Sequence, residues 1–203
     1  MNTDCCPELK LFEGFYDAIE SDRLYQRLFE EQDWPDNHYS VAGRQLTLPR
    51  LQTWHADTGI VYSYSDNLLQ TRDWSPLLSS IKTQIESYLN YRFNSVLVNL
   101  YRSGEDYVGW HSDNEPELGE QPYIASLTLG AARRFALRHK KTSEINDLVL
   151  ANGDLLVMEP NFQHHWQHSV PLDNSVTGGR INLTFRNVIP AKNNIQRNKR
   201  RQD

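Results

Sequence analysis

Apolar side chains recur at helical spacing in two stretches of the N-terminal half of the chain. FYDAIESDRLYQRLFEEQ (15–32) repeats them at roughly helical intervals, at Phe15, Ile19, Leu24 and Leu28. SPLLSSIKTQIESYLNYR (75–92) opens with a serine that can cap a helix and a proline suited to its first turn. Its apolar face would comprise Leu77, Leu78, Ile81, Ile85, Tyr88 and Leu89. Side chains spaced in this way share one face, so both stretches predict amphipathic helices.

From Phe93 onward the pattern changes to an alternation of apolar and polar residues, which is typical of half-buried strands. Five segments show it, separated by Gly, Pro and Asn turns: NSVLVNLY, YIASLTLG, RRFALRH, DLVLANGDLLVME and RINLTFRNV. They predict five or six strands. Two helices followed by a run of antiparallel strands predict an α+β fold whose core is a β-sandwich or jelly roll.

The stretch 33–73 follows neither pattern. It is broken by Pro35, Gly43, Pro49 and Gly59. Aromatic residues are dense in and beside it: Trp34, Tyr39, Trp54, Tyr62, Tyr64 and Trp74. We therefore expect short strands and loops here, with aromatic side chains able to reach the surface.

Composition narrows the class of protein. The 203 residues are 38% hydrophobic and 23% charged, which is ordinary for a globular protein, and without a repeat or linker they predict a single domain. No run of eighteen apolar residues occurs, so no membrane association is predicted. MNTDCCPELKLF has no signal-peptide pattern, and the adjacent Cys5 and Cys6 cannot link distant segments. Both observations favour a cytoplasmic location.

A net charge of −5 does not favour binding of the whole molecule to nucleic acid, so any such contact needs a local basic patch. One cluster is central: Arg133, Arg134, Arg138, Lys140 and Lys141. By alternation, one of its two adjacent arginines must point inward. A second cluster lies in the tail: Lys192, Arg197, Lys199, Arg200 and Arg201. A short basic terminus is more often a solvated end than a binding arm, so we favour the central cluster.

A histidine and an aspartate two residues apart, His111 and Asp113, end a predicted strand and so point to one face. Alone, the pair is weak evidence for a metal site, because such pairs also occur in solvated loops. QHHWQHSVP offers a third ligand among His164, His165 and His168. Two histidines and one carboxylate leave three coordination positions open, as in non-haem Fe(II) oxygenases. We expect the remaining histidines to be hydrogen-bonded surface side chains: His38, His55 and His139.

GGRINLTFRNV predicts a strand with two unlike faces. Its polar face comprises Arg180, Asn182, Thr184 and Arg186, opposite Ile181, Leu183 and Phe185. VLVNLYR repeats the pattern, with Asn99 and Tyr101 opposite Val96, Val98 and Leu100. These polar faces either meet water or line a cavity, and in a cavity the guanidiniums need an anionic partner. 2-Oxoglutarate would suit both sites, because it can pair with an arginine and chelate an iron at once.

Together, NLYRSGEDYVGWHSDNE, IASLTLGAARRFALRHK, QHSVP and RINLTFRN resemble the AlkB-type Fe(II)/2-oxoglutarate dioxygenases. The resemblance covers roughly residues 40–190, and PRLQTWHAD and IVYSYS are similar to the branch that repairs alkylated DNA. It implies a double-stranded β-helix, which is a distorted jelly roll. It also implies Fe(II), O2 and 2-oxoglutarate as cofactor and cosubstrates. The implied reaction is oxidative demethylation of N-alkylated bases, with release of formaldehyde, succinate and CO2.

The resemblance also implies roles for individual residues. His111, Asp113 and His168 would bind Fe(II). The 2-oxoglutarate pocket would be lined by Asn99, Tyr101, Arg180, Asn182, Thr184 and Arg186, with Arg180 pairing with the remote carboxylate. Around the flipped base, Tyr64 matches a stacking aromatic opposite His111, while Tyr62 and Glu115 match nearby polar positions; a core position for Tyr64 stays open. The nucleic-acid backbone would contact Arg138, His139, Lys140 and Lys141.

Within the single domain, the resemblance implies four regions. These are an N-terminal extension and helix (1–32), a nucleotide-recognition lid (33–73), a catalytic core with its supporting helix (74–190) and a basic tail (191–203). In the lid, Val41, Leu46 and Leu48 are either apolar wedge residues or core strand positions.

The favoured hypothesis is a monomeric demethylase acting on alkylated single- or double-stranded DNA. An oxygenase of the same chemistry acting on RNA or on a protein side chain is the second. A non-catalytic module that binds lesions is the third. The complete ligand set and both arginines argue against the third hypothesis, because a pure binder has no need of them.

Overall fold

The computed structural model describes residues 6–35, 38–41, 44–60, 63–64, 67–68 and 70–189, leaving aside the side chains of 39–41, 44–46, 63–64 and 67–68. Along the chain the elements are β1 (Leu9–Phe12), α1 (Ala18–Glu31), β2 (His38–Val41), β3 (Arg44–Thr47), β4 (Leu51–Ala56), β5 (Ser63–Tyr64), β6 (Asn67–Leu68), β7 (Thr71–Arg72), α2 (Pro76–Leu89), β8 (Ser95–Tyr101), β9 (Val108–His111), the 3-10 helix η1 (Pro116–Leu118), β10 (Ile124–Gly130), β11 (Arg133–His139), β12 (Ile145–Leu150), β13 (Leu155–Met158), α3 (Phe162–His165), β14 (Trp166–Val170) and β15 (Arg180–Arg186). No helix in this part of the chain is long and apolar enough to cross a membrane.

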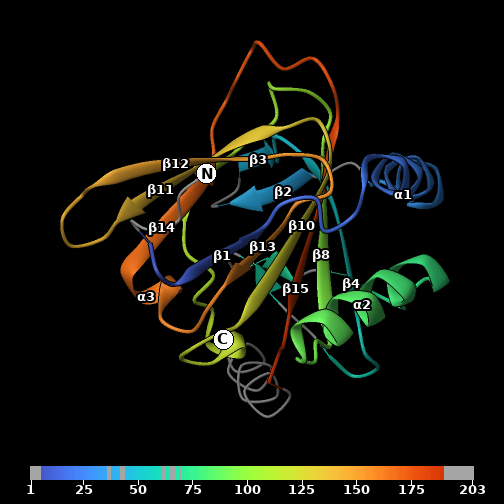
Figure 1. Ribbon diagram of the computed structural model, residues 1–203, viewed down its shortest axis with the longest axis horizontal. Coiled ribbons are helices and arrows are strands. Elements are labelled where there is room, and N and C mark those ends of the chain that lie inside the picture. The colour runs from blue at the N-terminus through green and yellow to red at the C-terminus, as the bar shows by residue number, and fades with distance from the viewer. Residues whose placement is uncertain are drawn as a thin grey trace.

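Two sheets form the core of the fold (Figure 1). The major sheet has seven strands in the order β1-β13-β10-β15-β8-β4-β7, and the minor sheet has four in the order β12-β11-β14-β9. Apart from the parallel pair β4 and β7, their neighbouring strands are antiparallel. The α+β jelly roll predicted from the strand pattern is confirmed.

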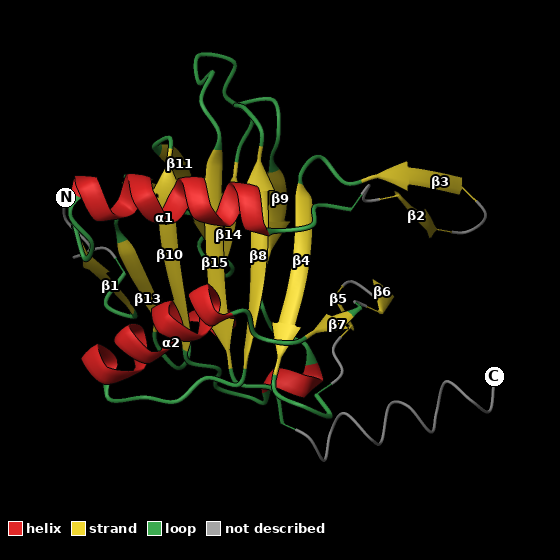
Figure 2. Ribbon diagram, turned by 90° about the vertical axis from the view of Figure 1, so that its right-hand side faces the viewer, coloured by secondary structure: helices red, strands yellow, loops and turns green. Residues whose placement is uncertain are grey.

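Helices α1 and α2 cross one face of the major sheet, and the minor sheet lies on its other side (Figure 2). The helix-side face is apolar, as alternation predicted: Val96, Val98, Leu100, Ile181, Leu183 and Phe185 are all buried there with the helices. Burying each such side chain contributes roughly 1.5–3 kcal/mol. The opposite face of the same strands therefore faces the minor sheet, and this places the polar residues between the sheets.

Both predicted helices form, and their caps match the sequence signals. Ser75 Oγ accepts the N–H of Leu78 at the start of α2, and Asp17 does the same for Glu20 at the start of α1. Their apolar faces were only partly predicted. Ile19 is 83% exposed and Tyr88 is 56% exposed, because the buried stripe of each helix is narrower than the apolar spacing suggested.

The stretch 33–73 differs from expectation at one strand. β4 pairs with β8 inside the major sheet, and Trp54 is 1% exposed, so this aromatic residue belongs to the core and not to the surface. β2 and β3 pair with each other, as do β5 and β6, outside the two main sheets. Of the three candidate wedge residues, Leu48 is half-buried, and the side chains of Val41 and Leu46 lie outside the described residues. The boundaries of the lid region remain a prediction.

The N-terminal segment contributes more than the sequence suggested. β1 pairs along its whole length with β13 at the edge of the major sheet. It is a four-residue strand, LKLF, too short to produce a clear alternation. The strand therefore escapes sequence analysis and is specified by its partner.

Candidate active site

A cavity lies between the two sheets, on the polar side of β8 and β15. Its lining includes the predicted polar residues from the major sheet and the predicted metal ligands from the minor sheet. The lining residues are Arg50, Leu97, Asn99, Tyr101, Val108, His111, Asp113, Ser126, Phe135, Met158, His168, Val170, Arg180, Asn182, Thr184 and Arg186. The polar strand faces therefore line a cavity and do not face water.

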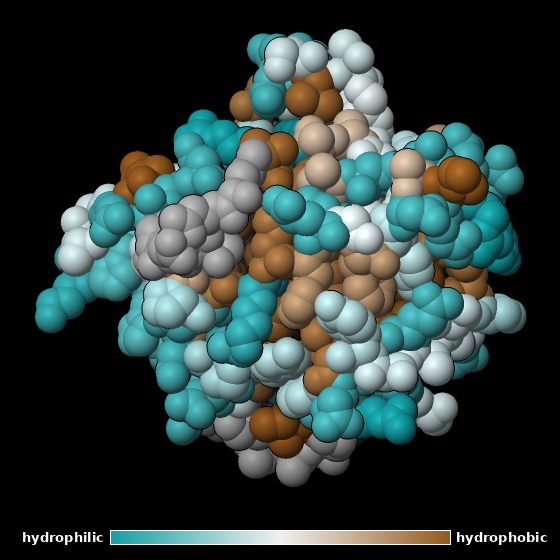
Figure 3. All heavy atoms as spheres, viewed as in Figure 1, coloured by the Kyte–Doolittle hydropathy of each residue, from teal (hydrophilic) through white to brown (hydrophobic). Residues whose placement is uncertain are grey.

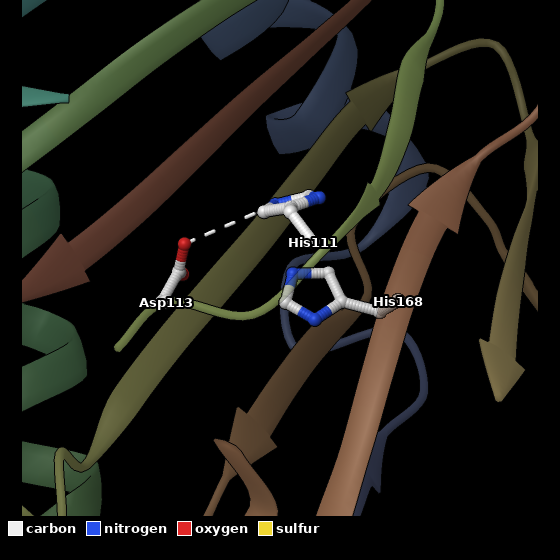
Figure 4. A group of neighbouring side chains, drawn as sticks. All are labelled: His111, Asp113 and His168. Carbon is white, nitrogen blue, oxygen red and sulfur yellow. Dashed lines mark ion pairs between the residues drawn. The ribbon is translucent and has the colours of Figure 1, made fainter. Parts of the chain in front are cut away.

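The His-Asp-His group lies at one side of this cavity. His111 ends β9, Asp113 follows it, and His168 is paired with His111 on the neighbouring strand β14. The two imidazole centroids are 4.2 Å apart, and His111 Nε2 lies 3.8 Å from Asp113 Oδ1. One potential ligand atom from each residue lies within 4.8 Å of the others. Figure 4 shows the three side chains gathered around a shared space, an arrangement compact enough for one metal ion.

Burial and charge give each of the three the protonation state that a metal requires. Burial lowers the pKa of His111, and burial together with the neighbouring His111 lowers the pKa of His168 to about 3. Burial alone would raise the pKa of Asp113, but Arg186 and the two imidazoles hold it at about 2. At neutral pH the group therefore offers two neutral imidazoles and one carboxylate.

Surrounding hydrogen bonds orient the group. His111 Nδ1 lies 2.9 Å from Gly109 O, and because only an N–H can donate to a carbonyl, Nε2 keeps its lone pair for a metal. Arg186 Nη2 donates to Asp113 Oδ2 at 2.8 Å. Asp113 Oδ1 is buried and accepts no hydrogen bond within the described part of the chain. A buried carboxylate oxygen with no donor fits a site that holds a cation.

Arg180 lies where β15 begins and is 2% exposed. Its Nη2 donates to Thr128 Oγ1 at 2.9 Å, whereas Nε and Nη1 are buried and make no hydrogen bond to any described residue. Burial lowers the pKa of Arg180 to about 10 despite the adjacent Tyr101, whose ring centroid lies 5.2 Å from the guanidinium carbon. The group is thus charged at neutral pH, and a buried, half-satisfied cation indicates an anionic ligand.

Between Arg180 and the metal group, the polar side chains are bonded to one another. Asn182 Nδ2 donates to Ser126 Oγ at 2.8 Å, and Thr184 Oγ1 donates to Asn182 Oδ1 at 2.9 Å. Because these side chains satisfy each other's hydrogen bonds, they form a fixed polar surface between Arg180 and the His-Asp-His group. A buried cation at one side of the cavity and a metal-ligand group at the other form a donor set suited to a dicarboxylate.

Sequence reasoning missed Arg50. This side chain is 4% exposed and lines the cavity, where its Nε donates to Asn99 Oδ1 at 3.1 Å. It follows Pro49 and directly precedes β4. The available signal was an arginine at the start of a strand in PRLQTWHAD, a segment that enters the sequence analysis only through its resemblance.

The other predicted site residues lie apart from the cavity lining. Glu115 is half-buried two residues beyond Asp113, next to η1. The segment 138–141 spans the end of β11 and the following turn, on the surface. Tyr62 lies outside the described residues, and Tyr64 is placed in β5 without its side chain. Their assignments near the base remain predictions.

The other histidines behave as expected, with one exception. His38 is exposed and lies 2.8 Å from Thr47 Oγ1, and His139 is bonded to Thr142. His55, however, is 5% exposed, so its expected surface position was wrong. It lies in β4 with Nδ1 2.7 Å from Asp73 O and Nε2 3.0 Å from Gln32 Oε1, because β4 is a core strand.

Comparisons with known proteins agree with this geometry. The model of the 2OG-Fe(II) oxygenase superfamily matches residues 8–186. Alpha-ketoglutarate-dependent dioxygenase alkB homolog 3 of Homo sapiens is 38% identical over 89% of this chain, which spans 66% of that protein. DNA oxidative demethylase ALKBH2 of Mus musculus is 36% identical over 87% of this chain and 79% of its own.

The fold is also shared with solved structures. A structure of OsALKBH1 superposes with a TM-score of 0.63 at 18% identity, covering 89% of this chain and 98% of that one. A 2OG-Fe(II) oxygenase-family protein from Burkholderia pseudomallei gives a TM-score of 0.59 at 14% identity, over 93% of this chain and 90% of its own. From the family match and the relatives, this chain belongs to the AlkB-type 2OG-Fe(II) oxygenases, dioxygenases that use Fe(II), 2-oxoglutarate and O2.

Proposed function

We propose that this protein oxidatively demethylates N-alkylated bases in DNA, with His111, Asp113 and His168 as its iron ligands. The observation that carries the proposal is the pairing of this group with the half-satisfied cation of Arg180 in one cavity. Support for the substrate comes from the relative named DNA oxidative demethylase ALKBH2. When bound, Fe(II) with O2 and 2-oxoglutarate supplies an oxidant able to hydroxylate an N-methyl group, which then leaves as formaldehyde while 2-oxoglutarate becomes succinate and CO2.

In this proposal the residues of the chain bind and orient the reactants. Arg180 pairs with the remote carboxylate of 2-oxoglutarate, while the bonded group of Asn182, Thr184 and Ser126 fixes the path of the cosubstrate. Arg186 keeps Asp113 ionised through the 2.8 Å contact to Oδ2, which leaves Oδ1 for the metal. The aromatic rings of Phe135 and Phe162, with centroids 5.2 and 5.8 Å from that of His168, exclude water from one side of the site.

The substrate is a nucleic-acid base, and a base must leave its stack to reach a buried metal. Glu115, Tyr62 and Tyr64 are the proposed contacts of that base, and Arg138, His139, Lys140 and Lys141 those of the backbone. Methylation on a pairing nitrogen weakens the base pair. Extracting an N-methylated base from the duplex therefore costs less free energy than extracting an intact base.

The test is formaldehyde release. Protein loaded with Fe(II) is incubated with 2-oxoglutarate and N-methylated oligonucleotides, as DNA and RNA and in single- and double-stranded form. A methylated-lysine peptide serves as the protein substrate. We expect formaldehyde from the DNA, matched mole for mole by succinate, and none without 2-oxoglutarate.

Two results would contradict the proposal. Formaldehyde only from RNA or only from the peptide would assign the same chemistry to another substrate. Tight binding of the methylated DNA without any formaldehyde would indicate a lesion-binding module. His168→Ala is the inactive control. His165→Ala is its matched variant, because His165 lies three residues before His168 in the chain but is half-exposed and paired with Glu8.

A further inference from the structure

The edge strand β9 carries one residue more than its partner. His111 is paired with His168 and Val108 with Val170, so β9 spans three steps where β14 spans two. This extra residue is a β-bulge, which lets both Val108 and His111 line the cavity. The residue between them that carries a large side chain, Trp110, is 37% exposed. An indole therefore stands at the surface directly beside a proposed metal ligand.

Trp110 belongs to a row of side chains on the outer face of the minor sheet. The guanidinium carbon of Arg138 lies 4.6 Å from the Trp110 ring centroid. On the strand between them, Gln167 Oε1 accepts from Arg138 Nε at 3.2 Å and from Nη2 at 2.7 Å. Arg138 is thus held over the indole by a residue that is directly opposite it in the sheet. The cation is preorganised, and no carboxylate neutralises it in the described contacts.

The charges around this row favour an anionic ligand. Lys140 and Lys141 follow Arg138 in the turn after β11 and are both exposed. On the same face, Asp147 is engaged by Arg134 at 2.9 Å, so its charge is compensated. Glu144, at the far side of the turn, bonds to Asn146. A cationic row on a chain of net charge −5 is charge-complementary to phosphates.

We propose that Trp110 stacks on an unpaired nucleobase next to the target nucleotide, while Arg138 contacts the phosphate that joins them. This inference rests on the proposed function and adds to it a preference for single-stranded over double-stranded substrate. An indole offers one flat face to any base, whatever its sequence, but only when that face is not covered by a base pair above it. The surface beside the active site is therefore built for single-stranded nucleic acid.

Figure 3 shows hydrophilic residues over much of one face of the molecule, with hydrophobic residues gathered among them. A second protein would need a broad, well-packed interface for stable docking, whereas the row described above consists of one indole, one guanidinium and the glutamine between them. A lone indole under a guanidinium matches base and phosphate better, because one stacks and the other pairs with the cation.

The test measures binding of undamaged oligothymidylate to the full chain without iron, by fluorescence anisotropy. Trp110→Ala is expected to weaken single-strand binding about ten-fold, with less than a two-fold effect on a duplex of the same length. Trp110→Phe should restore most of the affinity, because phenylalanine also stacks. Phe29→Ala removes another exposed aromatic residue, on α1, and should leave both affinities unchanged.

An equal loss for single strand and duplex would overturn the proposal, as would no loss at all. A cross-link removes any dependence on folding of the variants: 4-thiothymidine in the oligonucleotide is photolysed against the unmodified chain and mapped by mass spectrometry. Adducts at Trp110 or its immediate neighbours are expected, and adducts confined to the helix side would contradict the proposal. Because the DNA is undamaged and iron is omitted, these results stand apart from formaldehyde release, whose failure would overturn only the demethylase function.

Discussion

Arg180 is a cation buried beside Tyr101 with two nitrogens, Nε and Nη1, that bond to no described residue. An uncompensated buried charge costs free energy until its ligand arrives. We therefore expect Arg180→Met to stabilise the ligand-free protein by about 1–3 kcal/mol in urea unfolding. The same substitution should abolish the rise in Tm that 2-oxoglutarate produces in Mn²⁺-loaded protein.

The control for this prediction is Arg134→Met, which removes an equally long side chain whose partner, Asp147, lies at the surface. It should cost less than about 1 kcal/mol and leave the response to 2-oxoglutarate intact. If the Arg180 variant still responds to 2-oxoglutarate, another cation binds the remote carboxylate, and Arg50 is the next buried candidate.

The metal group allows a second comparison between two histidines of one segment. His168→Ala should weaken Co²⁺ binding by at least about 100-fold, measured by absorbance titration, because one of three ligands is lost. His165→Ala should bind Co²⁺ like the unmodified chain, since His165 contacts Glu8 and lies outside the cavity lining. Equal loss in both variants would indicate that the segment, and not the ligand, was disturbed.

For individual residues, the alternation of apolar and polar positions along the strands could predict much of the site. It placed Asn182 and Arg180 on one face of a strand, and the structure buries that face against the minor sheet. It could not find Arg50 or the buried position of His55. Both depend on β4 joining the major sheet, and a pairing between distant strands leaves no local trace in the sequence.

Two loops meet at one end of the sheets, the β8–β9 loop (102–107) and the β14–β15 loop (171–179), as seen at the top of Figure 1. Gly104 N–H donates to Val176 O at 2.7 Å, and Gly104 O accepts from Asp173 N at 2.9 Å. From below, Arg133 donates to the carbonyl oxygens of Ser103, Asp106 and Pro171. The buried guanidinium of Arg133 thereby links the loop that precedes β9 and His111 to the loop that precedes β15 and Arg180.

This contact leaves no room for a side chain on one of the loops. A Cβ at Gly104 would lie 1.7 Å from Asp173 O, which is a backbone atom, so Gly104→Ala must part the loops. We expect it to lower the free energy of unfolding by about 2–3 kcal/mol. Gly109→Ala is the matched control, because its Cβ would meet nothing within 4 Å, and it should change stability by less than about 1 kcal/mol. Equal effects in urea unfolding would show that the loops separate without cost.

The elements themselves were predicted unevenly, for physical reasons. The start of α2 was predicted to the residue, because its serine cap and first-turn proline agree, whereas the helix ends at Leu89, before the end of the predicted stretch 75–92. β1 was not predicted, since its four residues gain their stability from β13. The third helix, α3, also escaped, because a single turn carries no periodicity.

At the scale of the whole molecule, burial ties the site to the fold. His55 couples β4 to the C-terminal end of α1 through Gln32, while His111 and His168 lie between the sheets. Burial lowers the pKa of all three below its ordinary value of 6.5. Each therefore stabilises the fold as a neutral imidazole, and the unfolded chain binds the extra proton first as the pH falls.

The metal-free protein should accordingly lose stability between pH 7.5 and pH 5. A histidine with a lowered pKa contributes fully above 6.5, and its contribution falls below that pH by up to about 1.4 kcal/mol per pH unit. Carboxyl groups with lowered pKa, such as Asp113 and Glu8, contribute fully above their ordinary values of 3.8 and 4.5 and lose that contribution only below them, so they do not mask this window. Urea unfolding at pH 7.5, 6.5 and 5.5 measures the slope. His55→Gln should make it shallower, whereas His38→Gln, at an exposed position, should leave it unchanged. A slope that is flat in the unmodified chain would mean that the three imidazoles are solvated and that the sheets open more readily than their packing implies.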